Sequence, residues 1–271
     1  GYIALADVLL TRLATGESDL NLCLARDGLV IAVAQKLLLN REPERYSHVD
    51  PQRIKYCHVS RALLKRAADN PEFHDRFVRY FEQIGTSRAN NITLSDNVSF
   101  TGETFNGVKS LLGNKNVQGY YLDANEQEGL HSFLKDSIGD SRAGICKDNM
   151  LLLFEGMYNG SFESARDLEP EIAGGIKPKV ERKKFTPEVL QRGISSAGLA
   201  VLNEAAISGV IDAVDTLHRQ RLLKMPVTPV SRIMERFYEF TIASPSQIWQ
   251  DIWGSVPWEF QGLYVIKSMI L

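Results

Sequence analysis

The chain has 271 residues, which is enough to bury a substantial core as one large domain or two smaller ones. Its 31 basic and 33 acidic residues leave a net charge of −2, which excludes a general attraction to nucleic acid or acidic membranes. Its three cysteines are too few and too scattered for a disulfide framework or a zinc site, and they favour a reducing, cytoplasmic location.

The N-terminal part of the chain predicts a helix, a strand and a second helix. Residues 1–20 place apolar side chains on one helical face, and Gly16 supplies a stop. Leu20–Leu24 is typical of a buried strand. The next residues, Ala25–Gly28, are expected to form a glycine-containing loop before a helix that begins near Leu29.

A second unit of the same kind follows. Arg41–Pro51 is polar, contains two prolines and predicts a loop. Ile54–Val59 predicts the next strand of the sheet, which ends at Ser60 and Arg61. A basic residue at a strand end stands where ligands collect in open α/β sheets. Residues 69–90 are charged and aromatic, and we expect them to form a helical insertion or hood.

The most informative stretch is I-T-L-S-D-N-V-S-F-T-G-E-T. Ile92–Leu94 suits a short strand, and Ser95–Asn97 is predicted to leave it as a polar loop. Apolar residues at helical spacing follow, so a helix is expected to begin near Thr104. A strand, a loop with Gly102 and a helix N-terminus together make an anion cradle. Asp96 would then accept from sugar hydroxyls or bind magnesium through water.

The remainder of the chain is predicted to be mostly helical. Val117–Leu122 predicts one more strand, and 148–168 and 186–224 predict helices around a flexible basic linker at 173–184. The second helix carries a long apolar stripe of Leu199, Leu202, Ala206, Val210, Val214 and Leu217. That stripe is expected to be core. The tail after residue 237 is rich in aromatic side chains, which would fill a small core or stack on sugars.

Strands that alternate with helices indicate an α/β fold with a mostly parallel, Rossmann-like sheet. We assign this core to residues 1–125, and a helical portion that forms the acceptor side to residues 126–271. His58 and His74 have no partners at metal-ligand spacing, so no direct protein metal site is expected.

The stretch from Ile92 to Thr104 resembles the ribose-phosphate-binding motif of type I phosphoribosyltransferases. That motif has a hydrophobic strand, two acidic residues, a few variable residues and Thr-Gly-x-Thr. The resemblance implies a phosphoribosyltransferase fold, with Asp96 holding the ribose of phosphoribosyl pyrophosphate. It assigns the ribose and 5-phosphate to Asp96, Asn97, Val98, Ser99, Thr101, Gly102, Glu103 and Thr104. Asn97 departs from the pattern, which usually has a second acid there, so it is not expected to accept a proton.

In the same family an early loop contacts pyrophosphate, often through glycine or an Arg-Gly pair. The resemblance gives this role to Arg26, Asp27, Gly28, Ser60 and Arg61. Mg²⁺ is implied as the cofactor, held through pyrophosphate and water. A sugar hydroxyl is a poor nucleophile and needs a general base, so Asp27 joins Asp96 as a candidate catalytic residue. A loop-capping carboxylate explains Asp27 equally well, and a surface arginine explains Arg26.

A second resemblance rests on the order of five short segments: A-R-D-G, V-S-R, D-N-V-S-F-T-G-E-T, G-Y-Y-L and L-L-F-E-G-M-Y-N-G-S-F-E-S-A. This order is similar to modules that accompany haloacid-dehalogenase-type phosphatases in bacterial polysaccharide gene clusters. They include ribofuranosyltransferases of O-antigen and capsule assembly, which move ribose 5-phosphate onto a glycan before a phosphatase removes the phosphate. Glu155 and Glu163 would lie where the acceptor enters, unless they belong to a solvated helix face.

The implied partners are phosphoribosyl pyrophosphate, an oligosaccharide or polysaccharide acceptor, a fused or adjacent phosphatase and other glycosyltransferase modules. No nucleic-acid partner and no transmembrane segment are expected. The start at Gly1 suggests a module of a longer chain. Two other functions stay open: salvage of a nucleobase, for which the helical portion is larger than necessary, and non-catalytic sensing of a phosphorylated ribose.

Overall fold

The computed structural model describes residues 1–99, 101–139, 165–171, 174–180 and 196–225, and five single residues between 229 and 239. Side chains at 25–27 and 196–206 lie outside this description. The chain forms two compact units. The first comprises Gly1–Phe133, Ser164–Glu181 and Val210–Val227, and the second comprises Leu134–Glu163, Arg182–Gly209 and Thr228–Leu271. The α/β core predicted for residues 1–125 lies within the first unit.

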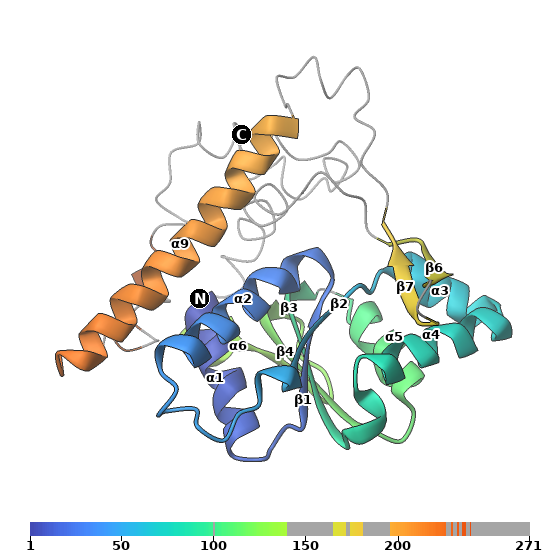
Figure 1. Cartoon of the computed structure of the whole chain (residues 1–271), viewed down its shortest axis with the longest axis horizontal. Helices are drawn as coiled ribbons and strands as arrows, with labels where there is room; N and C mark the ends of the chain where they lie inside the picture. The colour runs from blue at the N-terminus through green and yellow to red at the C-terminus, as the bar shows by residue number, and fades with distance from the viewer. Residues whose placement is uncertain are drawn as a thin grey trace. The chain divides into compact units, whose positions relative to one another are not determined.

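A five-stranded parallel sheet is the centre of the first unit, which confirms the predicted α/β class (Figure 1). Its strand order is β2-β1-β3-β4-β5. The strands are β1 (Leu20–Leu24), β2 (Ile54–Cys57), β3 (Asn91–Ser99), β4 (Asn116–Ala124) and β5 (Leu130–Ser132). The inner strands are almost wholly buried, because a parallel sheet is covered by helices on both faces.

Helices cover the two faces of the sheet. On one face, here named the α2 face, lie α1 (Tyr2–Ala14) and α2 (Ala25–Arg41). On the other, the α5 face, lie α3 (Arg61–Asp69), α4 (Pro71–Gln83) and α5 (Glu103–Leu112). Figure 1 shows α2 and α5 on opposite sides of β1 and β3. Short 3-10 turns at Pro51–Arg53 and Thr86–Arg88 precede β2 and β3, and α6 (Phe133–Ile138) follows β5.

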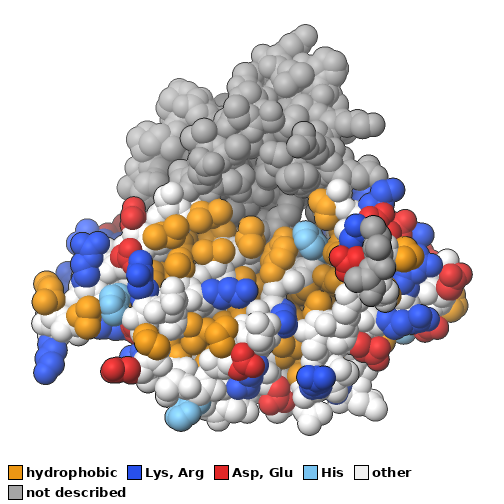
Figure 2. Space-filling view, in the orientation of Figure 1, with side chains coloured by type: hydrophobic (Ala, Val, Ile, Leu, Met, Phe, Trp, Pro, Cys, Tyr) orange, Lys and Arg blue, Asp and Glu red, His pale blue; other side chains and the backbone are white. Residues whose placement is uncertain are grey.

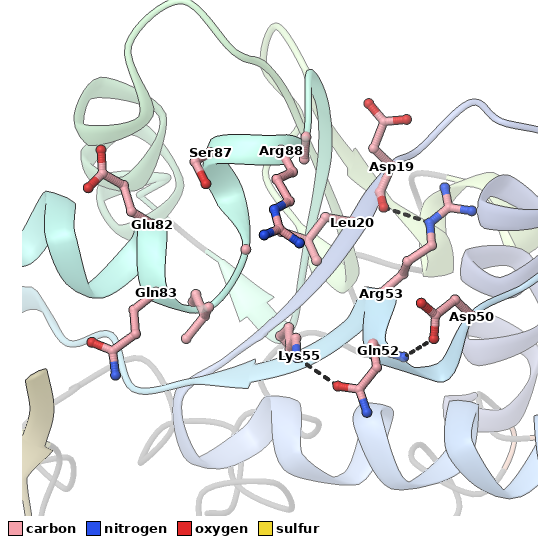
Figure 3. Close-up of a pocket in the computed structure, with 13 residues that line it drawn as sticks. Asp19, Leu20, Asp50, Gln52, Arg53, Lys55, Glu82, Gln83, Ser87 and Arg88 are labelled. Carbon is pink, nitrogen blue, oxygen red and sulfur yellow. Dashed lines mark hydrogen bonds between the residues drawn. The ribbon is translucent and has the colours of Figure 1, made fainter. Parts of the chain in front are cut away.

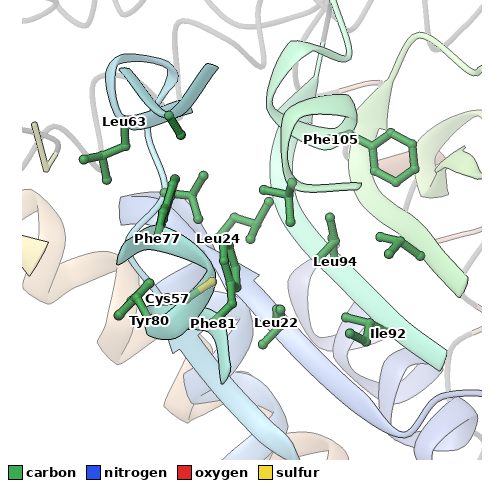
Figure 4. Packing of buried hydrophobic residues seen from close by; sticks show 14 of the residues in the cluster. Leu22, Leu24, Cys57, Leu63, Phe77, Tyr80, Phe81, Ile92, Leu94 and Phe105 are labelled. Carbon is green, nitrogen blue, oxygen red and sulfur yellow. The ribbon is translucent and has the colours of Figure 1, made fainter. Parts of the chain in front are cut away.

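The main core lies between the α5 face and its helices. Leucines of β1 and β3 pack with the aromatic side chains of α4, and Cys57 of β2 belongs to the same cluster (Figure 4). The α4 contribution consists of Phe73, Phe77, Tyr80 and Phe81, all at most 5% exposed. The segment 69–90, expected as a hood, therefore packs against the sheet as one of its covering helices.

The later segments are partly as predicted. The helix α9 (Ser196–Leu222) confirms the helical prediction there, and Val210 and Val214 of its stripe are buried. The predicted flexible linker is wrong at its start, because β6 (Asp167–Pro170) and β7 (Ile176–Lys179) form an antiparallel pair. The helix predicted at 148–168 is wrong at its end, because Asp167 and Leu168 belong to β6. Most of that predicted helix, with Glu155 and Glu163, and the aromatic side chains of the tail lie outside the described residues.

Candidate functional site

The order in which the chain adds strands to the sheet reverses between β1 and β3. From β1 the chain runs through α2, on the α2 face, to β2. From β3 it runs through α5, on the α5 face, to β4 on the other side of the sheet. The N-termini of α2 and α5 therefore both begin at the carboxyl edge of the sheet, on either side of the β1–β3 pair. In open parallel sheets this is where ligands bind. Most of the predicted site residues lie along this edge.

Strand β3 is longer than expected. It stays paired with β4 as far as Ser99, opposite Ala124, so the prediction that Ser95–Asn97 forms a loop is wrong. Pairing with β4 on both sides of Asn97 satisfies backbone groups that a loop would leave to solvent. Asp96 lies within the strand, is partly exposed, and its carboxylate accepts from the Asn97 N–H at 2.8 Å.

The loop into α5 is short and turns at Gly102. This residue has φ +70° and is the N-cap of α5, which begins at Glu103 and so confirms the helix predicted near Thr104. A Cβ at Gly102 would also collide with the side chain of Gln127. Thr101 is exposed, and its hydroxyl accepts from the Glu103 N–H at 3.3 Å. Gly102 has no side chain to cap the helix, so the N–H groups of the first turn after Glu103 can bind an anion.

Arg61 faces this loop from the first turn of α3. Its Nη1 lies 3.9 Å from Oε2 of Glu103, and both side chains are more than 60% exposed. Such an exposed pair contributes about 0–1 kcal/mol, so a phosphate can replace the carboxylate as the partner of Arg61. Ser60 is differently engaged. Its hydroxyl accepts from the Leu63 N–H as the N-cap of α3 and donates to the Ala165 carbonyl.

The predicted loop at Ala25–Gly28 is wrong, because α2 begins at Ala25 directly after β1. Gly28 lies in the first helical turn, where a Cβ would come within 2.7 Å of the Cys23 carbonyl carbon. The glycine thus allows α2 to approach the sheet closely. Arg26 and Asp27 belong to the same turn at the carboxyl edge, and their side chains lie outside the described part of the structure.

The two faces of β3 separate residues that are neighbours in the sequence. Side chains alternate along a strand, so Asp96 and Val98 lie on the α5 face, and Asn97 and Ser99 on the α2 face. Asn97 is only 1% exposed. The structure therefore brings Asp96, Val98, Arg61 and the Gly102 loop to one side of the edge, but does not bring Asn97 and Ser99 with them.

A second carboxylate on the α5 face was missed by the sequence reasoning. Asp123 pairs in register with Val98, two residues beyond the pair of Asp96 and Tyr121. It is 2% exposed and accepts from the Ser132 hydroxyl at 3.0 Å. The sequence did contain a signal for it, because Asp123 directly follows the apolar strand predicted at Val117–Leu122. An acidic pair therefore exists at this edge, built from β3 and β4 rather than from adjacent residues of one strand.

Burial raises the pKa of two thiols and a tyrosine near this edge. Desolvation raises the pKa of Cys23 to about 11 and raises that of Cys57 well above its usual value. Burial also raises the pKa of Tyr121, with a smaller contribution from the charge of Asp96. A thiol with a raised pKa is a poor nucleophile. Among the described groups of this edge, the carboxylates and cations are therefore the ones that a ligand could use.

Another hollow, of about 700 Å³, opens at the amino ends of β1 and β2 (Figure 3). Its charged groups are largely committed to the fold. Asp19 accepts from the Asn90 and Asn91 N–H groups, and Arg53 donates to three backbone carbonyls. We therefore place the candidate site at the carboxyl edge and not here.

Among the described residues, no group of His, Cys, Asp and Glu has the arrangement of a direct metal site. None of the helices described is both long enough and apolar enough to cross a bilayer. The face in Figure 2 mixes basic and acidic side chains around apolar patches. Comparison with protein-family models and with curated proteins finds no match to this chain.

Proposed function

We propose that this chain transfers ribose 5-phosphate from phosphoribosyl pyrophosphate to a glycan acceptor in bacterial O-antigen or capsule assembly. The observation that carries the proposal is the combination of Asp96 with the Gly102 loop at the switch point of a parallel sheet. This combination follows the residue order of the phosphoribosyltransferase motif. Arg61 adds a cation across from the loop.

In this mechanism the bond between the anomeric carbon and pyrophosphate breaks as the acceptor oxygen attacks. The transition state carries positive charge on the ribose and negative charge on the departing pyrophosphate. Asp96 would hold the ribose hydroxyls and stabilise the ring charge, while the N-terminus of α5 and Thr101 would bind the 5-phosphate. Arg61 and the first turn of α2 would stabilise the pyrophosphate. Mg²⁺ would reach the site bound to pyrophosphate, where it supplies further positive charge.

The base that removes the acceptor proton has two candidates. Asp27 lies in the first turn of α2, and Asp123 lies on the same face as Asp96. Separate replacement of the two carboxylates tests the assignment: of Asp27→Asn and Asp123→Asn, the variant that lacks the base should show the larger loss of transfer rate at saturating donor. The Ser132 hydroxyl would hold Asp123 in a fixed orientation.

The test is incubation with phosphoribosyl pyrophosphate, Mg²⁺ and candidate oligosaccharides, followed by mass spectrometry. The expected product is heavier than the acceptor by one ribose phosphate, because the proposed loop binds the 5-phosphate and transfer leaves it intact. Transfer to a free nucleobase, and not to an oligosaccharide, would indicate a salvage enzyme instead. Binding without release of pyrophosphate, with every acceptor class, would indicate a sensor.

Arg61 provides a matched binding test. Arg61→Ala should weaken donor binding by about tenfold or more, since a hydrogen bond to a charged group contributes roughly 1.5–3 kcal/mol. Arg88→Ala is the control, because Arg88 is exposed at the opposite end of β3. Equal affinity of the two variants in calorimetry would remove Arg61 from the pyrophosphate site.

A further inference from the structure

A row of buried polar side chains runs along the α2 face towards the carboxyl edge. Asn21 donates to the Leu9 carbonyl at 3.1 Å and to Gln35 Oε1 at 2.9 Å. Gln35 and Ser95 both donate to Cys23 Sγ, each at 3.3 Å. Up to Ser95, the polar groups of this row are therefore hydrogen-bonded, as buried polar groups normally are.

Asn97 follows Ser95 on the same face of β3, and its buried side chain is not hydrogen-bonded within the part of the chain that the structure describes. Its side chain is 1% exposed, and neither Nδ2 nor Oδ1 has a hydrogen-bond partner among the described residues. A leucine of similar shape would avoid the cost of burying an amide in this way. An unsatisfied buried amide at the ligand edge of a sheet points to a partner that is present only when a ligand binds.

The N-terminus of α2 lies next to this amide. Cys23 pairs in register with Ser95, so Asn97 is level with Ala25, the first residue of α2. Gly28 brings the first turn of the helix against Cys23 on the same face. The N-cap residue of this 17-residue helix is Leu24, whose side chain makes no capping hydrogen bond. The leading N–H groups of the helix and the positive end of its dipole therefore favour an anion beside Asn97.

We propose that Asn97 binds the pyrophosphate group of the donor at the N-terminus of α2, donating through Nδ2, and does not hold the ribose with Asp96. The identity of this anion rests on the proposed function. Because Asn97 is 1% exposed, the anion reaches it only when the groups that cover this side chain move aside. An amide suits this position, since a carboxylate would repel pyrophosphate where Nδ2 can donate to it.

Two buried asparagines on the same sheet face provide a matched test. Asn21 is hydrogen-bonded and Asn97 is not, so Asn21→Leu should lower the melting temperature and Asn97→Leu should leave it unchanged or raise it. Calorimetric titration with magnesium pyrophosphate should show binding to the wild type and affinity about tenfold lower or worse in Asn97→Leu. If Asn97→Leu does not fold, Asn97→Ala supports the same binding comparison.

The outcomes separate this inference from the proposed function. Equal pyrophosphate affinity in wild type and Asn97→Leu would overturn the inference even if phosphoribosyl transfer is observed. A destabilisation by Asn97→Leu as large as that by Asn21→Leu would also overturn it, because Asn97 would then be a structural residue. Loss of pyrophosphate binding in Asn97→Leu supports the inference even if no acceptor is ever modified. A wild type that does not bind pyrophosphate overturns it.

Discussion

At the scale of single residues, Asp96 carries the proposed chemistry. Asp96→Asn keeps the shape of the side chain on the central strand β3 but removes its charge. Transfer should fall by about 10²-fold or more, a typical effect of losing a positioned catalytic group, while the melting temperature changes little. Asp75→Asn, at a carboxylate that is 72% exposed on α4, is the control for an altered surface charge. Normal turnover in Asp96→Asn would remove this residue from the site.

Gly102 permits a comparison between the two ends of one helix. Gly102 and Gly113 flank α5, and both have positive φ, of +70° and +61°. Alanine at either position should lower stability by roughly 1–2 kcal/mol through backbone strain. Gly102 is the N-cap of α5 in the proposed phosphate loop, whereas Gly113 is the C-cap at the other end of the helix. Strain at Gly102 distorts the loop that would bind the phosphate, so donor affinity, measured by calorimetry, should fall in Gly102→Ala and persist in Gly113→Ala. Equal affinity in both would argue against phosphate binding at this loop.

At the scale of elements, Asp19 fixes the α1–β1 connection to the start of β3. Its carboxylate accepts from the Asn91 and Asn90 N–H groups, each at 2.9 Å, and these bonds lower its pKa. A folded-state pKa below the unfolded value of 3.8 means that the stabilisation is present above that pH. It is lost as the pH falls through the folded pKa.

Asp19→Ala should therefore lower the free energy of unfolding by about 1 kcal/mol at pH 7, and the deficit should shrink below pH about 4. Urea unfolding at the two pH values measures it. Asp75→Ala should show no comparable deficit at pH 7. A deficit for Asp19→Ala that is the same at both pH values would mean that the charge of the carboxylate is unimportant.

At the scale of the whole molecule, ion pairs join the end of α9 to the first two helices of the chain. Arg221 pairs with Glu42 and, at 3.3 Å, with Asp7. The Glu42 side chain is only 7% exposed, and its other cation, Arg45, is 3.9 Å away, so removal of Arg221 leaves a nearly buried carboxylate with one long ion pair. Arg221→Ala should lower the free energy of unfolding by roughly 1–3 kcal/mol. Arg219→Ala removes an exposed arginine of the same last turn and should have little effect. Similar thermal melts for the two variants would contradict this role of Arg221.

Much of the fold follows from local sequence patterns. The run Leu20–Leu24 becomes β1 without change, and the alternation of strands and helices predicts the parallel α/β sheet. The helix start near Thr104 is also local, because apolar spacing and a preceding glycine specify it. Such features succeed because hydrophobic periodicity and turn residues act over only a few positions.

The organisation of the candidate site was decided by tertiary contacts. Ser95, Asp96 and Asn97 form a polar run that suggests a loop, but pairing with β4 extends β3 through them. Once they are in a strand, its two-residue period sends Asp96 to the α5 face and Asn97 to the α2 face. The same pairing brings Asp123, 27 positions later, to the side of Asp96. The sequence by itself determined the fold class and the residues available at the edge. Strand register determined which of them share a surface, because register depends on pairing between distant segments.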